Sequence, residues 1–250
     1  MTMRSWSGTL NALVLVGLLL IAWQALFEVA GEHAMAPPVE TFRYLGQLLA
    51  TNAFWGHLTE TGQAFLAALA ISVVLGLAIG FVLGLHRFSS EVAEPILVAF
   101  YSVPKITLYP IVLLAFGLGM PAKIAFGAIH GIVPVAIFTM SAVGNIKPVL
   151  LKTARVLKLK PWTVVTSVLF PAALPEIFTG LRVGFSLTLI GTLLGEMFGS
   201  QRGLGYLLMT AIGLQNIKVI MAVTLLVVLF AAAVSIILIY IDRKLHRRAT

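Results

Sequence analysis

Two charged residues, Lys105 and Glu196, stand within or beside long apolar stretches of the sequence. A charge at the centre of a lipid bilayer costs roughly 2.5 to 3.5 kcal/mol, so such a side chain usually faces a cavity or a partner. The chemistry open to these residues is electrostatic recognition. Lys105 suits an anion, and Lys105, Tyr109 and Glu196 are candidates for lining a polar path through the apolar region. Two alternatives stay open: Lys105 extends its ammonium to headgroups from a helix end, and Glu196 makes a structural hydrogen bond at the outer interface.

A basic segment between Asn145 and Glu176 is the second candidate site. Its basic residues alternate with apolar ones, a pattern typical of a short amphipathic helix, and its apolar stretches are too short to cross a bilayer. Such a helix must bury its apolar side against a protein partner or against anionic headgroups. The basic residues are Lys147, Lys152, Arg155, Lys158 and Lys160. Pro161, Pro171 and Pro175 then predict a helix, a turn and a second short helix.

No set of residues in the sequence indicates catalysis or metal binding. Cysteine is absent, and the five histidines show no ligand-like pair spacing. The phosphate-binding pattern G-x-x-x-x-G-K-[ST] is also missing, because the glycine-rich run from Gly199 to Gly205 has no following lysine. We therefore expect a chain that is not an enzyme, binds no cofactor or metal, and does not bind ATP itself.

The elements that carry these residues are predicted to be membrane helices. The chain of 250 residues is 60% hydrophobic and 10% charged, with a mean hydropathy of +1.03, whereas a soluble domain is about a quarter charged. The composition predicts an all-α polytopic membrane protein of about six transmembrane helices. The expected spans are 8–27, 61–85, 96–118, 122–143, 177–198 and 219–241. The first is expected to remain, since no cleavage pattern follows it.

No linker divides the sequence, so we predict a single transmembrane domain over residues 1–250. Within it, residues 1–60 form the first span and an outer segment, and residues 61–245 form the core, with a cytoplasmic loop at 145–176. Six crossings place both termini on one side of the membrane. A cytoplasmic N-terminus puts most basic residues inside and only Arg43, Lys123, Arg202 and Lys218 outside, as the positive-inside rule requires. The net charge of +8 is thereby explained without a nucleic-acid partner.

Four stretches in order resemble the permease subunits of ATP-binding-cassette (ABC) importers, in the subgroup grouped with nitrate, sulfonate, taurine and bicarbonate importers. The stretch from Lys152 through Trp162 to Phe170-Pro171-Ala172-Ala173-Leu174-Pro175 is similar to the cytoplasmic "EAA" loop of that family. The other three stretches are Met35-Ala36-Pro37-Pro38, Val103-Pro104-Lys105 through Phe116-Gly117, and Gly195-Glu196-Met197 through Gly203-Leu204-Gly205-Tyr206.

This resemblance implies a type I ABC importer permease (MetI-like) fold and inward movement of a small, anionic solute by alternating access. It also implies that the loop couples the permease to a separate ATPase, through Lys152, Thr153, Ala154, Arg155, Leu157, Lys158, Lys160, Pro161 and Trp162. The implied partners are two ATPase subunits that hold ATP and magnesium, a second permease copy or a related permease, an extracytoplasmic solute-binding protein, and lipid. The implied location is the bacterial inner membrane.

The chain departs from the family pattern at two positions of this loop. Lys152 stands where the family has glutamate, and Lys158 stands where it has the glycine that eases the turn after the helix. A non-glycine residue at positive φ costs about 1 kcal/mol, so we expect either a reshaped turn or a helix that runs on. The competing function is an ATPase-independent secondary transporter or channel, which predicts charged residues paired at mid-membrane.

Overall fold

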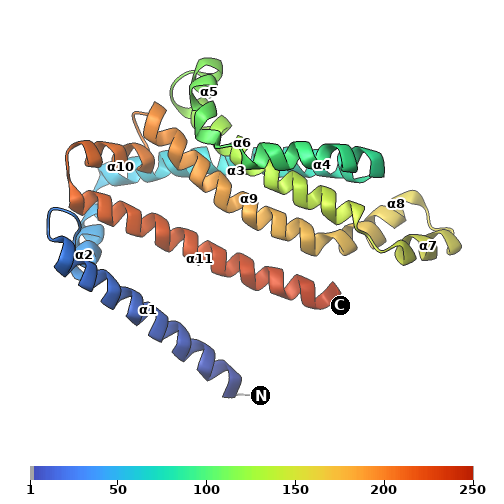
Figure 1. Ribbon diagram of the computed structural model, residues 1–250, viewed down its shortest axis with the longest axis horizontal. Helices are drawn as coiled ribbons and strands as arrows, with labels where there is room; N and C mark the ends of the chain where they lie inside the picture. The colour runs from blue at the N-terminus through green and yellow to red at the C-terminus, as the bar shows by residue number, and fades with distance from the viewer. Residues whose placement is uncertain (1–2, 250) are drawn as a thin grey trace. The chain divides into compact units, whose positions relative to one another are not determined.

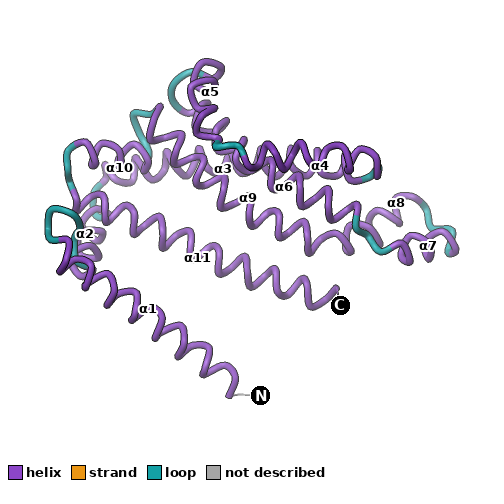
Figure 2. Tube along the Cα trace, viewed as in Figure 1, coloured by secondary structure: helices purple, strands orange, loops and turns teal. Residues whose placement is uncertain are grey.

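The computed structural model describes residues 3–249, except for the side chains of 3–9, 151, 161 and 246–249. Every regular element within residues 3–249 is helical (Figures 1 and 2). The elements are α1 (Met3–Ala30), α2 (Pro38–Leu49), α3 (Asn52–Gly84), α4 (Arg87–Ser102), the 3₁₀ helix η1 (Lys105–Leu108), α5 (Tyr109–Phe116), α6 (Met120–Gly144), α7 (Pro148–Val156), α8 (Pro161–Val164), the π-helix η2 (Val165–Leu169), α9 (Phe170–Gly199), α10 (Leu204–Gly213) and α11 (Ile217–Ala249).

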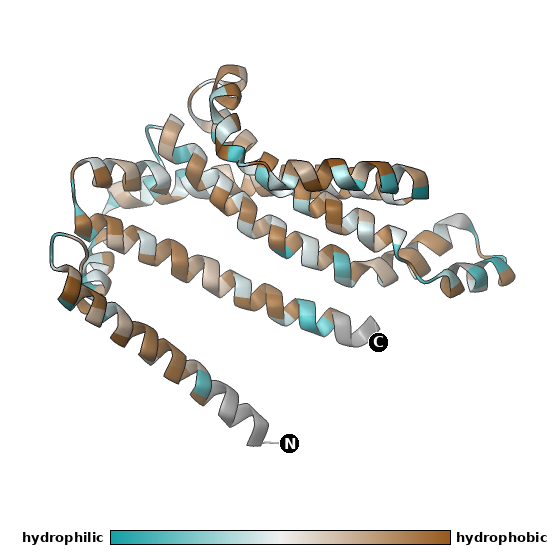
Figure 3. Ribbon diagram, in the orientation of Figure 1, coloured by the Kyte–Doolittle hydropathy of each residue, from teal (hydrophilic) through white to brown (hydrophobic). Residues whose placement is uncertain are grey.

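Five described helices are long and apolar enough to cross a membrane, and a sixth crossing results if one bent pair counts as a single span. The five are Leu10–Ala30, Asn52–Gly84, Met120–Gly144, Trp162–Gly199 and Ile217–Leu245. Figure 3 shows hydrophobic residues along most of α1 and α11. The prediction of an all-helical polytopic protein with about six spans is confirmed.

The third expected span differs from the prediction of a single helix over 96–118. It begins earlier, at Arg87, and consists of two helices, Arg87–Ser102 and Lys105–Phe116, that meet at an angle of 86°. The residue before Pro104 is extended, with Val103 at φ −63° and ψ 133°. Proline disfavours the helical conformation in the residue before it and supplies no N–H to continue the ladder, so the span breaks here.

Pro171 and Pro175 do not divide the chain, contrary to the prediction from the sequence. The short helix that starts at Pro161 continues through the π-helix η2 into α9, so residues Trp162–Gly199 form one helix of 38 residues. The backbone N–H of Phe170 donates to the carbonyl of Val165, five residues earlier. This wider turn comes directly before Pro171. It widens the helix where the proline ring would otherwise clash with a backbone carbonyl of the preceding turn.

The chain divides into two compact units, one of Met1–Trp55 with Leu207–Leu229, and one of Gly56–Tyr206 with Phe230–Thr250. In the second, larger unit, α6 and α9 lie side by side along their length (Figure 1). α3 packs closely on α6 because it presents glycine there. A Cβ added at Gly76 would lie 2.6 Å from Cβ of Val135, and one added at Gly80 would lie 2.5 Å from Cβ of Thr139. Glycines four residues apart on one helix face thus permit the close approach of α3 to α6.

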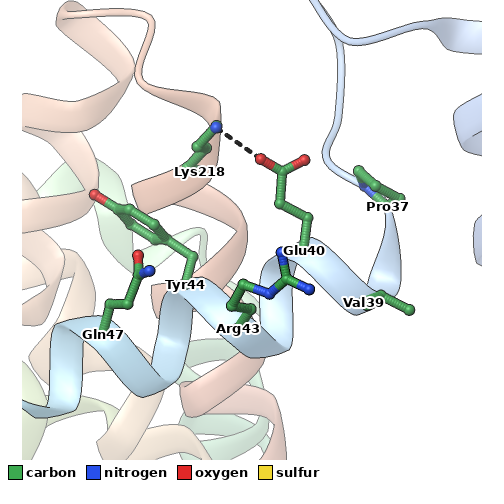
Figure 4. Close-up of a pocket in the computed structure, with 7 residues that line it drawn as sticks. All are labelled: Pro37, Val39, Glu40, Arg43, Tyr44, Gln47 and Lys218. Atoms are coloured by element: carbon green, nitrogen blue, oxygen red, sulfur yellow. Dashed lines mark ion pairs between the residues drawn. The ribbon is translucent and has the colours of Figure 1, made fainter.

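The smaller unit is organised around α2, which buries Pro38, Thr41 and Leu45 on one face. The indole N–H of Trp23 donates to the carbonyl of Ala36 at 3.1 Å and ties α1 to the turn that precedes α2. Lys218 pairs with Glu40 at 2.6 Å (Figure 4). The N-terminal span is thereby joined to the segment that starts α11 within one unit.

Candidate functional site

The basic segment folds as α7, a tight turn and α8, at the end of the α6–α9 pair. α7 ends in a Schellman motif: the N–H of Lys158 donates to the carbonyl of Arg155 at 3.0 Å, and the N–H of Leu159 donates to that of Ala154 at 3.1 Å. Lys158 takes φ +50°, the left-handed conformation that favours glycine. The turn is therefore kept with lysine in the strained position, and neither of the two outcomes that we expected is found.

The apolar side of this segment is largely uncovered by its own chain. Val156 is 81% exposed, Leu157 is 63% exposed and Trp162 is 76% exposed, whereas Ala154 is buried. Exposed apolar residues in this number on one turn are typical of a contact surface for a partner.

The side chains of Lys147, Lys152, Arg155, Lys158 and Lys160 are all exposed. Within the described residues none of them forms an ion pair, and the sequence holds no aspartate or glutamate between Glu94 and Glu176. The exposed Thr153 donates its hydroxyl hydrogen to the carbonyl of Val149 at 3.0 Å. Pro161 begins α8, and its side chain lies outside the described part of the chain. The structure thus brings the candidate coupling residues together on one projecting turn.

Lys105 lies at the break of the bent span, as the first residue of η1. It is 8% exposed, and its ammonium donates to the carbonyl of Tyr101 at 3.0 Å, with the ring of Tyr101 5.3 Å away. Among the described residues no carboxylate pairs with it. The carbonyl and the aromatic ring compensate the charge only in part, so an anion that reaches Lys105 is attracted to it.

Tyr109 and Glu196 form hydrogen bonds with partners other than Lys105. Tyr109 is buried and donates its phenolic hydrogen to the carbonyl of Gly195 at 2.9 Å, so it links α5 to α9. Its ring meets that of Phe126 edge to face, with centroids 5.0 Å apart. This contact holds the second half of the bent span against α6 and α9.

Glu196 is 0% exposed and stands at the centre of a buried polar cluster. Its carboxylate accepts hydrogen bonds from the hydroxyl of Thr61 and from the N–H of Gly205 at 3.0 Å. The N–H of Leu204 donates to the Thr61 oxygen at 2.8 Å. The ammonium of Lys123 lies 3.8 Å from the carboxylate. The cluster joins α3, α6, α9 and the connection to α10.

Lys123 supplies the positive charge of this cluster, although sequence reasoning assigned it only to an outer segment. It is 1% exposed, and its ammonium donates to Glu60 and to the carbonyl of Arg202, each at 2.9 Å. One signal in the sequence was available. Lys123 lies inside the first turn of one predicted span and Glu196 in the last turn of the next long one, so antiparallel packing of these helices brings the two charges together.

The structure also has a surface hollow of about 480 Å³ in the smaller unit, lined by Pro37, Val39, Glu40, Arg43, Tyr44, Gln47 and Lys218 (Figure 4). Glu40 neutralises Lys218 at 2.6 Å, and Arg43 adds one further positive charge to the lining. Tyr44 and Arg43 follow Glu40 on α2. None of the candidate residues from the sequence lines this hollow.

Comparison with known proteins gives one family whose model matches residues 72–250, the binding-protein-dependent transport system inner membrane components. A probable ABC transporter permease protein of Haemophilus influenzae is 31% identical over 95% of this chain and 96% of its own length. A putative aliphatic sulfonates transport permease of Bacillus subtilis is 28% identical over 83% of this chain and 76% of its own length. The taurine transport system permease of Escherichia coli is 27% identical over 81% of this chain and 76% of its own length.

Solved structures resemble the chain in fold. A chain of the MetNI methionine ABC transporter in an inward-facing conformation matches with a TM-score of 0.62 and 22% identity, over 80% of this chain and 96% of that one. At this identity the likeness speaks for the arrangement of the helices alone. It agrees with the type I importer permease fold predicted from the sequence.

Proposed function

Because the chain belongs to the binding-protein-dependent transport system inner membrane components and is a transmembrane permease subunit of an ABC importer, we propose that it moves a small anionic solute inward by alternating access. Sulfonates, taurine, nitrate and small carboxylates are the candidate solutes. The ATP and magnesium that drive the cycle are held by separate ATPase subunits, and this chain supplies the membrane element that switches between two states.

The observation that carries the choice of an anion is Lys105. Its ammonium is 8% exposed, lies at the break between α4 and η1, and has no carboxylate partner among the described residues. The relatives named for aliphatic sulfonates and for taurine support the same class of solute. In this proposal Lys105 touches the solute, whereas Tyr109 and Glu196 act through the helices that they hold together.

The same proposal assigns Thr153 to Trp162, with Lys152 before them, to the contact with the ATPase. The projecting turn, its exposed apolar residues and its place at one end of α6 and α9 support this assignment. Two such permeases, or this chain and a related one, with two ATPase subunits and an extracytoplasmic binding protein form the working importer. The hydrolytic site belongs to the ATPase and not to this chain.

The orientation that we propose places both termini in the cytoplasm. The basic turn after α7 and the Glu196 cluster lie at opposite ends of the α6–α9 pair, because Lys123 starts α6 beside Glu196 and Ala142, near the end of α6, packs with Ala173 and Ile177. The 25 residues of α6 extend about 37 Å, enough to separate the two sites by a bilayer core. Basic residues on the α7 side then make that side cytoplasmic.

An ATPase-independent transporter is not favoured. Such a protein couples ions through charges paired at mid-membrane, whereas the buried pair here, Lys123 and Glu196, lies in the first turn of α6 and the last turn of α9. The family assignment points the same way.

Co-purification tests the proposed function. The tagged chain is expressed with an ATPase subunit from its own gene neighbourhood, and the ATPase that stays bound is measured for the native chain and for Leu157→Ala with Trp162→Ala. We expect the native chain to retain the ATPase and the double variant to lose it. If the double variant retains as much ATPase as the native chain, the coupling assignment is contradicted.

A further inference from the structure

The end of α7, the turn after it and the start of α8 carry two kinds of exposed side chain, which together we call the basic docking surface. Its members are Lys152, Arg155, Val156, Leu157, Lys158, Lys160 and Trp162. The three apolar members are between 63% and 81% exposed, and the four basic ones are exposed around them. An apolar centre inside a charged rim is the usual arrangement of a protein interface.

The length of the helix that follows places this surface beyond the lipid. Residues Trp162–Gly199 form one helix of 38 residues, which extends about 57 Å, whereas a hydrocarbon core is about 30 Å thick. The Glu196 cluster fixes the far end of that helix to Thr61 on α3 and to the first turn of α6. The first residues of the helix therefore stand well outside the hydrocarbon at the other end, even for a tilted helix. A surface this far out meets a protein more readily than it meets headgroups.

The charge of the surface is not neutralised by its own chain. No aspartate or glutamate occurs between Glu94 and Glu176, and within the described residues no basic member forms an ion pair. Asp242, an acid on α11, lies 3.8 Å from Arg182 and accepts a hydrogen bond from Thr179. Five positive side chains, counting Lys147 at the start of α7, thus remain available to a partner.

The strained turn gives this charge a defined direction. Lys158 adopts φ +50° in the Schellman motif. Glycine would adopt this conformation with less backbone strain, so the lysine side chain is present on the surface at a backbone cost of about 1 kcal/mol. Two hydrogen bonds of 3.0 and 3.1 Å fix the turn that presents it. A charge presented on a fixed turn contributes to selecting a partner by complementarity.

We propose that the basic docking surface binds an apolar groove rimmed by carboxylates on the ATPase subunit, so that charge complementarity selects an acidic ATPase partner. The proposal rests on the assignment of this segment to the ATPase contact. It adds the chemistry of the partner, namely an acidic rim facing Lys152, Arg155, Lys158 and Lys160. An ATPase whose groove is basic would be rejected by like-charge repulsion.

The test reverses the charge of the surface and leaves its shape in place. The tagged permease and its ATPase subunit are reconstituted in nanodiscs of neutral phosphatidylcholine, and the retained ATPase is measured in low and high salt. The reversing variant is Lys152→Glu with Lys158→Glu, and the neutral variant is Lys152→Gln with Lys158→Gln. Both keep a non-glycine residue at the strained position. Arg243→Glu with Lys244→Glu makes the same change of charge at exposed positions on α11 and is the matched control.

We expect the reversing variant to weaken ATPase binding about ten-fold or more, the neutral variant to weaken it less, and the α11 control to bind as the native chain does. High salt should weaken the native complex and narrow the difference between the variants. If the reversing variant binds as tightly as the native chain while Leu157→Ala with Trp162→Ala loses the ATPase, the coupling assignment stands and the acidic rim is refuted.

Two other outcomes are distinguishable from that one. Retention of the ATPase by Leu157→Ala with Trp162→Ala would overturn the coupling assignment and the acidic rim together. A charge effect that is absent in phosphatidylcholine and emerges only when an anionic phospholipid is added would mean that headgroups are the partner of the basic residues, and it would overturn the proposal.

Discussion

Thr61 and Glu196 stand 135 residues apart in the sequence, yet the hydroxyl oxygen of Thr61 lies 2.8 Å from one carboxylate oxygen of Glu196 and 3.0 Å from the other. The same hydroxyl accepts the N–H of Leu204 at 2.8 Å. One small side chain on α3 thus binds both the end of α9 and the start of α10. The connection between α9 and α10 is held by buried hydrogen bonds as well as by apolar packing.

Loss of the Thr61 hydroxyl should destabilise the permease. Thr61→Val keeps the shape of the side chain but leaves the buried carboxylate and the N–H of Leu204 short of a partner, which costs about 2–3 kcal/mol. We expect a lower thermal midpoint in detergent for Thr61→Val and a nearly native midpoint for Thr61→Ser, which keeps the hydroxyl. Equal midpoints for the two variants would show that the bond contributes nothing measurable.

The charges of Lys123 and Glu196 should couple in a double-mutant cycle. Lys123 is 1% exposed and Glu196 is 0% exposed. Removing the ammonium leaves the carboxylate of Glu196 buried without a positive partner, at a cost of about 3–5 kcal/mol, whereas Glu196→Gln leaves Lys123 paired with Glu60 at 2.9 Å. We expect Lys123→Met to destabilise strongly, Glu196→Gln to destabilise less, and the double variant to lose less than the sum of the two. Additive losses in chemical denaturation would indicate that the two charges act independently.

Gly203 should not tolerate a side chain. It has φ +118°, and a Cβ there would overlap the carboxylate of Glu196. Gly203→Ala should therefore unfold the connection between α9 and α10 or lower the thermal midpoint sharply, by the combined cost of backbone strain and displacement of a buried carboxylate. Gly62→Ala is the control, since nothing lies within 4 Å of a Cβ at that position on α3. A Gly203→Ala protein as stable as Gly62→Ala would contradict the packing described.

Lys158→Gly should tighten the turn after α7. Glycine relieves the cost of φ +50°, about 1 kcal/mol, which corresponds to about five-fold slower opening of the turn. Hydrogen exchange of the Leu159 amide, which is bonded to the carbonyl of Ala154, reports that opening. We expect slower exchange in Lys158→Gly and faster exchange in Lys160→Gly, where φ is not positive. The opposite order would show that Lys158 is not strained.

Lys105→Ala should impair transport without affecting assembly. The ammonium is the attraction for an anion that we propose at the break of the bent span, so ATP-driven uptake of a sulfonate or of nitrate in proteoliposomes should fall about ten-fold or more. Lys105→Arg, which keeps the charge, should retain more activity. Retained ATPase and the thermal midpoint serve as checks on folding. Native uptake by a folded Lys105→Ala protein would remove Lys105 from the solute path.

The sequence by itself determined the features that depend on neighbouring residues. Apolar stretches of about 20 residues define helices that cross a bilayer, because the rise per residue and the thickness of the hydrocarbon core are fixed. The alternation of basic and apolar residues around Arg155 predicted a short amphipathic helix, whereas the strained φ of Lys158 was not predicted. The family resemblance followed from local motifs of the same kind.

The tertiary structure alone decided which distant residues meet. The sequence showed Glu196 as an isolated charge and assigned Lys123 to an outer segment, whereas antiparallel packing of α6 and α9 places both in one buried cluster with Thr61. The tertiary structure also decided that the span bends by 86° at Pro104, whereas the helix stays unbroken at Pro171 because a π turn precedes that proline. These outcomes depend on contacts and hydrogen bonds between positions far apart in the chain or on one specific turn geometry, and local propensity does not encode either.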